Sequence, residues 1–228
     1  MLQLQHFTFF DKILYRGGVM IKPFENINPK NREKLLRTLG AHTYTFKKNE
    51  KVLKSLIVDD YVGIVLSGTV NIIRYEYNGD ITVVDEITAD NIFGYNINST
   101  DSNEYDIIAT SEARILIIDY IRIKNTTMYN KIYYNQFIKN LYIIINEILN
   151  KRNERIKILT KKTIREKLLA YFNIERNKNH SKNIYLKSTF KELADYLAVD
   201  RSAMSRELKY MKDEGFIEIK KKRITILY

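Results

Sequence analysis

Cysteine is absent from this chain of 228 residues, and histidine occurs only three times, as His6, His42 and His180. Without cysteine the chain cannot form disulfides, cysteine-ligated zinc sites or cysteine-held iron–sulfur clusters, which fits a reducing compartment. The histidines are too far apart in the sequence for the short spacings of metal motifs, so a metal-dependent enzyme of the β-barrel type is not expected. No Ser-His-Asp setting stands out either. We therefore expect no enzyme, no metal and no cofactor.

A long hydrophobic run is also missing. No apolar stretch approaches the roughly 18 residues that a membrane-spanning helix needs. The first residues, MLQLQHFTFFDK, lack both the basic region and the small-residue cleavage site of a secretory signal. We expect a cytoplasmic protein that has no membrane partner.

Acidic residues are scarce in one part of the chain only. Residues 1–149 hold 17 Lys and Arg and 17 Asp and Glu, whereas residues 150–228 hold 21 and 10. The whole formal excess of +11 therefore lies in the C-terminal segment. A basic segment joined to a neutral one is typical of a nucleic-acid-binding module attached to a part with another task.

Proline and glycine, with two and eight occurrences, are scarce, and those present mark boundaries. Asn28 and Pro29 predict the start of a helix that ends before Gly40. From Thr43 to about Asp119, short runs rich in Val, Ile, Tyr and Thr alternate with polar or glycine-bearing breaks. This pattern is typical of an antiparallel β-barrel or sandwich.

Two glycines predict turns within the β region. Ser67–Gly68 interrupts one long apolar stretch, and Asn78–Gly79 separates two apolar runs. An Asn-Gly pair in that setting is the strongest short sequence signal for a β-hairpin. We interpret these glycines as turn formers rather than ligand-binding residues.

A long helix is expected from about Tyr129 to Leu159, because apolar residues recur there at alternating spacings of four and three. The stripe consists of Tyr134, Ile138, Leu141, Ile145 and Ile148. Two partners fit this stripe: the protein's own β domain, or the parallel helix of a second subunit. Flanking apolar residues widen the face beyond a single contact, which favours a homodimer.

The C-terminal segment predicts two short helices followed by a hairpin. Thr189 with Glu192 forms a capping box before the first helix, and Asp200 caps a second helix that begins at Arg201. The final stretch, FIEIKKKRITILY, is typical of two strands joined by a basic turn. Helix, turn, helix and hairpin in this order predict a winged helix-turn-helix.

In a helix-turn-helix, the second helix lies in the major groove of DNA with its N-terminal residues at base edges. Arg206 is our main candidate for a base-reading residue, because arginine can donate two hydrogen bonds to guanine, whereas Arg201 fits phosphate as well as base. Backbone N–H groups near Thr189 and the basic turn would hold phosphates on either side. The candidate DNA-binding residues are Thr189, Arg201, Ser202, Ser205, Arg206, Lys209, Lys220, Lys221, Lys222 and Arg223. An ordinary amphipathic surface helix would show a similar stripe, so the interpretation depends on this context.

The motif FKELADYLAVDRSAMSRELKYMKDEGFIEI resembles the helix-turn-helix pattern of the bacterial Crp/Fnr transcription regulators, and FKKNEKVL, LSGTV and NIFGY resemble segments of that family's β domain. The resemblance covers nearly the whole chain and implies an α+β fold in three parts. These are an effector-sensing, jelly-roll antiparallel β-barrel like cyclic-nucleotide-binding domains, with an N-terminal helix (residues 1–128), a dimerisation helix (129–159) and a winged helix-turn-helix (160–228). The resemblance also implies a homodimer that binds an inverted repeat in double-stranded DNA.

The sequence departs from the family pattern at the effector site. Cyclic-AMP-binding members have a glutamate after Phe-Gly and an Arg-Ser pair shortly afterwards. Here Tyr95 follows Phe-Gly, and Asn103 and Glu104 stand where the pair would be, so an anionic phosphate would meet a carboxylate. We expect no control by cyclic AMP. The candidate effector pocket consists of Tyr61, Phe93, Gly94, Tyr95, Asn103, Glu104, Tyr133 and Tyr134.

The remaining partners stay open. The sequence leaves two alternatives: control by a small-molecule effector other than cyclic AMP, or activity without any effector. RNA polymerase is a further candidate partner. A second interpretation is a small-molecule-sensing barrel protein whose basic C-terminal module binds RNA or an acidic partner. The absence of RNA-type stacking motifs weighs against that interpretation.

Overall fold

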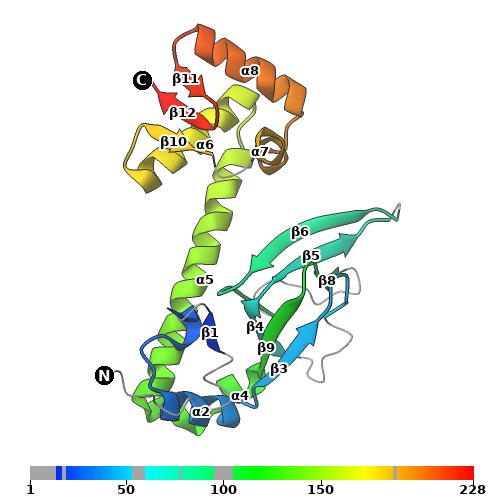
Figure 1. The fold of residues 1–228 in the computed structure, drawn as a ribbon, viewed down its shortest axis with the longest axis vertical. Helices are drawn as coiled ribbons and strands as arrows, with labels where there is room; N and C mark the ends of the chain where they lie inside the picture. Colours follow the sequence, from blue (N-terminus) through cyan, green and yellow to red (C-terminus); the bar gives the residue numbers. More distant parts are fainter. Residues whose placement is uncertain (1–13, 17–18, 53–59, 78, 95–104, 187–188) are drawn as a thin grey trace. The chain divides into compact units, whose positions relative to one another are not determined.

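The computed structural model describes residues 14–16, 19–52, 60–77, 79–94, 105–186 and 189–228 (Figure 1). The chain divides into two compact units, Met1–Asn146 and Glu147–Tyr228. None of the helices in the described ranges is long and apolar enough to cross a membrane.

The N-terminal unit begins with short elements that lead into one helix. These are β1 (Tyr15–Arg16), β2 (Val19–Met20), the 3-10 turn η1 (Lys22–Phe24) and α2 (Pro29–Thr38). The Asn28 side chain accepts a hydrogen bond from the Asn31 backbone N–H at 2.9 Å, and Pro29 occupies the first helical position. Leu35, Leu36 and Leu39 are fully buried. The helix expected from its cap and proline is therefore confirmed.

Among the residues that the structure describes, seven strands then form two antiparallel sheets. The first has the order β3-β9-β4-β7 and the second the order β6-β5-β8. The strands are β3 (His42–Phe46), β4 (Tyr61–Ser67), β5 (Thr69–Tyr75), β6 (Ile81–Thr88), β7 (Ile92–Gly94), β8 (Tyr105–Ala109) and β9 (Ala113–Asp119). Phe46 and Ile115 from the first sheet share one core with Ile72 and Ile107 from the second. The antiparallel β fold is confirmed, but the described strands form a sandwich of two sheets rather than a closed barrel.

The two glycine turns have different roles. Gly68, at φ +81°, links β4 of one sheet to β5 of the other, and a Cβ there would lie 2.2 Å from the Glu112 carbonyl oxygen. Gly79, at φ +87°, lies between the paired strands β5 and β6, where Tyr75 faces Ile81. The hairpin is confirmed, although Asn78 itself lies outside the described residues.

Two short helical segments, α4 (Tyr120–Lys124) and η3 (Thr127–Asn130), precede the long helix α5 (Ile132–Leu159). The first half of α5 packs on its own N-terminal unit. Phe137 stacks on Phe24 with ring centroids 5.4 Å apart. The Asn140 amide donates hydrogen bonds to the backbone oxygens of Pro23 and Glu25 at 3.1 and 2.9 Å. The expected long helix is confirmed.

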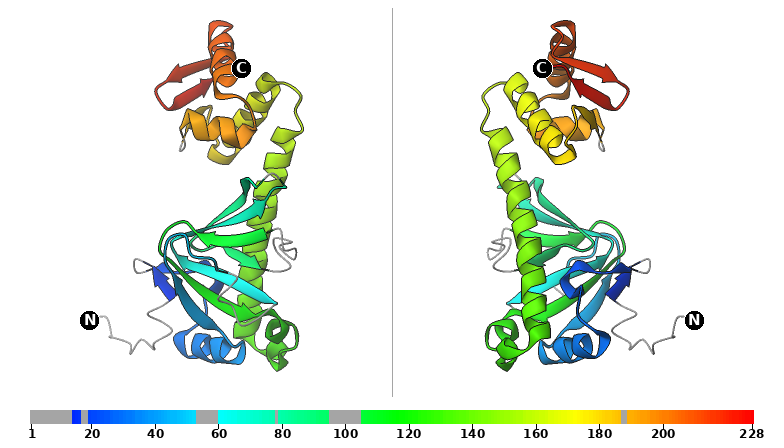
Figure 2. Two further views of the ribbon diagram at one scale, coloured as in Figure 1. Left: turned by 90° about the vertical axis from the view of Figure 1, so that its right-hand side faces the viewer. Right: turned by 90° about the vertical axis from the view of Figure 1, so that its left-hand side faces the viewer.

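The C-terminal unit is a winged helix-turn-helix, as expected. It contains α6 (Ile164–Asn179), β10 (Asn183–Tyr185), α7 (Phe190–Leu197), α8 (Arg201–Asp213), β11 (Ile217–Lys220) and β12 (Arg223–Ile226). The strands form one antiparallel sheet in the order β10-β12-β11, and the β11–β12 hairpin projects beside the helices (Figure 2). Ile158 from the end of α5 belongs to the same buried core as Phe172, Leu193 and Met204. The last turn of α5 is therefore part of the helix-turn-helix module.

Candidate nucleic-acid interface

Helix α8 presents a polar face to solvent and an apolar face to the core. The Asp200 carboxylate accepts a hydrogen bond from the Ala203 backbone N–H at 2.7 Å, which caps the helix as its sequence predicts. The buried side chains are Met204, Leu208 and Met211. The exposed side chains include Arg201, Ser202, Ser205, Arg206 and Lys209. The five residues proposed to contact DNA from this helix thus share one exposed face.

The turn between α7 and α8 depends on a residue in the left-handed region. Ala198 has φ +50° and ψ +59° and closes α7. The Val199 backbone N–H donates to the Ala194 carbonyl oxygen at 3.1 Å. From α6, the Lys167 ammonium donates to the backbone oxygens of Leu197 and Ala198 at 3.1 and 3.3 Å. These bonds satisfy carbonyl groups that the end of a helix leaves open, and they fix the start of α8.

The start of α7 differs from a simple phosphate-binding helix end. The Thr189 backbone N–H and hydroxyl donate to one oxygen of Glu192, at 2.6 and 3.0 Å. The Glu192 backbone N–H in turn donates to the Thr189 hydroxyl at 3.2 Å. Hydrogen bonds from Thr189, and then the nearby charges of Lys222 and Lys191, lower the pKa of Glu192. The donors of Thr189 that the sequence suggested for a phosphate are therefore bound to a carboxylate, and the nearby cations are Lys191 and Lys222.

The basic turn of the wing lies close to this helix start. Lys220, Lys221 and Lys222 are exposed, and Arg223 is half-buried. The Leu186 backbone N–H donates to the Lys222 carbonyl oxygen at 2.9 Å, which ties the wing to the segment before α7. Lys220 forms an ion pair with Glu218 at 2.8 Å, so part of its charge is neutralised within the wing. The structure thus brings the wing and the start of α7 together at one end of the C-terminal unit.

The sequence alone did not indicate the residues that hold α8 in place. Arg165 of α6 donates to Glu207 of α8 and to Glu214, the residue that caps α8, which lie 42 and 49 residues away in the sequence. Charged residues are common in the first turn of surface helices, so the sequence near Arg165 gives no indication that it pairs with Glu207 and Glu214. Lys167 is unmarked for the same reason.

The candidate effector residues fall into separate environments. Tyr61 and Phe93 are buried in the core of the β sandwich, with ring centroids 6.0 Å apart at 76°. Burial, and then the charge of Asp106, raises the pKa of the Tyr61 phenol. A Cβ at Gly94 would lie 2.3 Å from the Tyr61 carbonyl oxygen, so packing alone explains this glycine. Tyr95, Asn103 and Glu104 lie outside the described residues.

The two tyrosines at the start of α5 bind neighbouring residues. The Tyr134 hydroxyl donates to the Ile123 backbone oxygen at 2.8 Å, and the Tyr133 hydroxyl lies 3.8 Å from the Met128 sulfur. Both contacts fix the connection between α4 and α5. Their observed role is therefore structural.

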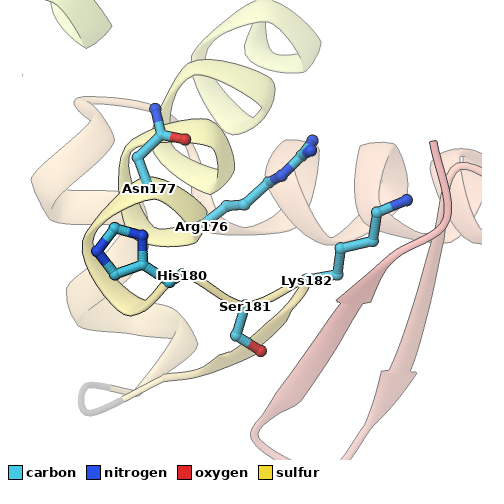
Figure 3. Close-up of a pocket in the computed structure, with 5 residues that line it drawn as sticks. All are labelled: Arg176, Asn177, His180, Ser181 and Lys182. Carbon is cyan, nitrogen blue, oxygen red and sulfur yellow. The ribbon is translucent and has the colours of Figure 1, made fainter.

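A shallow recess of about 490 Å³ lies where α6 ends and β10 begins (Figure 3). It is lined by Arg176, Asn177, His180, Ser181 and Lys182. Arg176 and Lys182 extend toward one side, whereas His180 extends toward the other (Figure 3). The basic groups of this recess thus do not converge on one point.

The stripe on α5 is divided between two faces. Tyr134 and Leu141 are buried within the chain, whereas Ile138, Ile145 and Ile148 are half-buried. Phe137 and Ile144, which flank the stripe, are also buried. Part of the stripe therefore packs on the N-terminal unit, as the alternative interpretation of the sequence held.

A neighbouring face of α5 remains open and also has a heptad pattern. Its members are Ile138, Tyr142, Ile145, Leu149, Arg152, Ile156 and Leu159, spaced four and three residues apart. Tyr142, Leu149 and Ile156 have exposed fractions of 65%, 48% and 56%. Six of the seven residues are apolar and four of them are exposed, which is the pattern of a helix that pairs in a coiled coil. We call these seven residues the α5 seam.

Comparison with known proteins yields two family matches. Residues 43–129 match the model of the cyclic nucleotide-binding domain, and residues 166–228 match that of the Crp-like helix-turn-helix domain. No curated protein sequence is similar enough to count as a match.

Several solved structures share the fold at low sequence identity. A CooA mutant from Carboxydothermus hydrogenoformans has 17% identity and a TM-score of 0.55, with 86% of each chain covered. CprK complexed with OCPA has 13% identity and a TM-score of 0.59, with 86% of this chain and 92% of that chain covered. The c-di-GMP responsive regulator CLP from Xanthomonas campestris has 15% identity and a TM-score of 0.52, with 86% and 99% covered. With a cyclic-nucleotide-binding β domain, a long helix and a Crp-like helix-turn-helix in one order on one chain, the protein belongs to the Crp/Fnr family of transcription regulators.

Proposed function

We propose that this protein is a sequence-specific regulator that binds an inverted repeat in duplex DNA as a homodimer, without control by cyclic AMP. The observation that carries the proposal is the exposed face of α8, where two arginines, two serines and a lysine lie together beyond a capped N-terminus. The basic wing and the start of α7 lie beside one another in the same unit.

The residues of α8 have distinct roles in this proposal. Arg206, in the second turn, donates to guanine in the major groove, because its planar guanidinium can form two parallel hydrogen bonds with that base. Arg201, next to the cap, contacts either phosphate or base. Ser205 already donates to the Arg201 backbone oxygen at 2.9 Å, so its hydroxyl contributes chiefly as an acceptor. Lys221 and Lys222 of the wing hold phosphates and add affinity without sequence information.

The α5 seam supports the homodimer. A parallel pairing of two such helices would cover Tyr142, Leu149 and Ile156 of each copy, which solvent otherwise surrounds. The two α8 helices would then read half-sites about 34–36 Å apart on one side of the duplex, related by the two-fold axis of the dimer. The dimer interface proposed here is thus the open face of α5 rather than the whole stripe expected from sequence.

The effector proposal rests on the sequence. Glu104 and Tyr95 replace the residues that cyclic-AMP binders of the family use, and both lie outside the described residues. Proteins of similar fold are associated with different small molecules: CprK is complexed with OCPA, and CLP is responsive to c-di-GMP. This diversity is compatible with a regulator whose ligand is not cyclic AMP.

The test of the DNA proposal is selection of bound fragments from a genomic library by the purified protein, with and without cyclic AMP. We expect an inverted repeat recovered equally in both conditions. Recovery only with cyclic AMP would contradict cyclic-AMP independence. Preference for single-stranded RNA of the same sequence over the duplex would contradict DNA recognition.

The test of the dimer is sedimentation of Leu149→Glu, with Asn150→Glu as the matched control. Both variants add one charge to α5, but only the first places it in the α5 seam. We expect Leu149→Glu to sediment as a monomer and the control as a dimer. A dimer in both variants would show that the seam is not the interface.

A further inference from the structure

Arg165, at the start of α6, contacts α8 and the residue that caps its C-terminal end. Its Nε donates to Glu207 at 2.5 Å, and its two terminal nitrogens donate to the two oxygens of Glu214 at 2.7 and 2.8 Å. The guanidinium also lies over the Phe216 ring, 5.9 Å from its centroid. One side chain thus contacts α8, the residue that caps it, and the residue before β11.

The geometry of this contact restrains α8 along its axis and around it. Glu207 and Glu214 are seven residues apart, which on a helix corresponds to about 10 Å along the axis on one face. A single contact would let the helix slide or rotate about that point. Two contacts from one planar guanidinium fix both the rotation of α8 about its axis and its position along that axis, because the donors of the guanidinium are held in a rigid plane.

The same contact binds a carboxylate next to Arg206, the proposed base-reading residue. Glu207 directly follows Arg206 in the sequence, and its side chain is only 22% exposed. Hydrogen bonds from Arg165 lower the pKa of Glu214, so that group remains a carboxylate bound to the guanidinium. Bonds to Glu214 and then Glu207 raise the pKa of Arg165. The ion pairs keep the carboxylates of Glu207 and of the capping residue Glu214 bound to Arg165 of α6.

We propose that Arg165 is a positioning residue for DNA recognition: it sets the rotation of α8 and thereby the reach of Arg206 to base edges. This inference rests on the proposed DNA-binding function. Arg165 is not among the residues that we expect to contact DNA, so its role in distinguishing one DNA sequence from another would be indirect.

The first experiment compares wild type, Arg165→Ala and Arg165→Lys for binding to the DNA fragment that wild type selects and to a scrambled duplex of equal length. We expect Arg165→Ala to lose about tenfold on the selected fragment, the size of losing one base contact, and little on the scrambled one. Arg165→Lys keeps the charge but can engage only one carboxylate well, so its loss should be intermediate. Equal losses on both duplexes, or full binding by Arg165→Lys, would show that charge alone matters and would overturn the proposal.

The matched control is Lys178→Ala, which removes a cation and a 2.6 Å ion pair with Glu154 in the same unit without touching α8. Its ratio of selected to scrambled affinity should equal that of wild type. A thermal melt of each variant separates a loss of fold from a loss of discrimination.

A second experiment is independent of DNA. Because the chain has no cysteine, cysteines introduced at Asn173 of α6 and Tyr210 of α8 would be the only sites for spin labels. We expect a narrow distance distribution in the otherwise unchanged protein and in Lys178→Ala, and a broadened or shifted one in Arg165→Ala. An unchanged distribution in Arg165→Ala would refute positioning, whereas a failure of wild type to select any duplex would refute the proposed function instead.

Discussion

Replacing Ala198 by glycine should stabilise the helix-turn-helix unit. Ala198 holds φ +50° and ψ +59° between α7 and α8, a conformation in which the Cβ of an L-residue crowds the backbone. Glycine has no Cβ and adopts this region freely. The hydrogen bonds of the turn use backbone atoms of Ala194 and Val199 and the Lys167 ammonium, so the substitution preserves them.

The magnitude follows from two opposing terms. The left-handed region costs a residue other than glycine about 1–2 kcal/mol, which the substitution removes. Glycine loses more backbone freedom on folding than alanine does, and this loss destabilises the folded state by about 0.5–1 kcal/mol. The Ala198 side chain is exposed, so the lost methyl group adds little to this balance. The difference lies between about 0 and about 1.5 kcal/mol, and its midpoint of about 0.75 kcal/mol corresponds to about 3–6 °C in Tm for a unit of this size if it unfolds separately.

The assay is a thermal melt of the full chain, with Ala170→Gly as the matched control. Ala170 lies in the middle of α6, where the same exchange should destabilise by about 1 kcal/mol because glycine is a poor helix former. The two variants should therefore shift Tm in opposite directions. A fall in Tm for Ala198→Gly, comparable to that of the control, would refute the reasoning about this turn.

Three further predictions concern binding and packing. Glu192→Gln should strengthen binding to every duplex by about two- to fivefold in a titration, because glutamine preserves the capping box while a charge that faces phosphates is lost; weaker binding would contradict this. Arg206→Ala should cost about 1–3 kcal/mol on the selected fragment and relax specificity, whereas Lys221→Ala should weaken all duplexes alike and reduce the salt slope by about one; matching profiles for the two variants would argue against separate roles. Phe137→Ala should lower the free energy of unfolding by about 3–5 kcal/mol in denaturant titration, because its ring is fully buried against Phe24; a loss below 1 kcal/mol would mean that the site collapses around the gap.

Local signals in the sequence predicted the elements that local chemistry determines. Asn28, Thr189 and Asp200 each cap a helix as expected, since an N-cap needs only a side-chain acceptor within three residues of a free N–H. Gly79 marks the β5–β6 hairpin for a similar reason: the strands on either side pair directly. These features need no knowledge of distant contacts.

Features that depend on distant contacts were less accessible. A series of short strands fits a barrel or a sandwich equally well, and only the pairing of β4 with β7 and β9, and of β5 with β6 and β8, separates the two sheets. On α5, apolar residues occupy more than one face, so spacing alone could not show that Tyr134 and Leu141 pack inward while Tyr142 and Leu149 do not. Heptad spacing fits both rows, and burial distinguishes them.

The positions of the acidic residues in the C-terminal unit concentrate its excess positive charge on one face. Counted along the sequence, ten carboxylates are mixed with 21 cations from residue 150 onward, and Glu207 directly follows Arg206. In the fold, Arg165 binds Glu207 and Glu214 on the side of α6, while Arg206 is exposed. The ion pairs of Arg165 therefore offset the negative charges of Glu207 and Glu214, and the electrostatic potential at the exposed basic face stays positive. The two substitutions should therefore differ in kind as well as in sign. Neutralising Glu192, which lies near the wing cations, should strengthen binding to every duplex. Removing Arg165 should weaken binding chiefly to the selected fragment, because its main effect is on the position of α8.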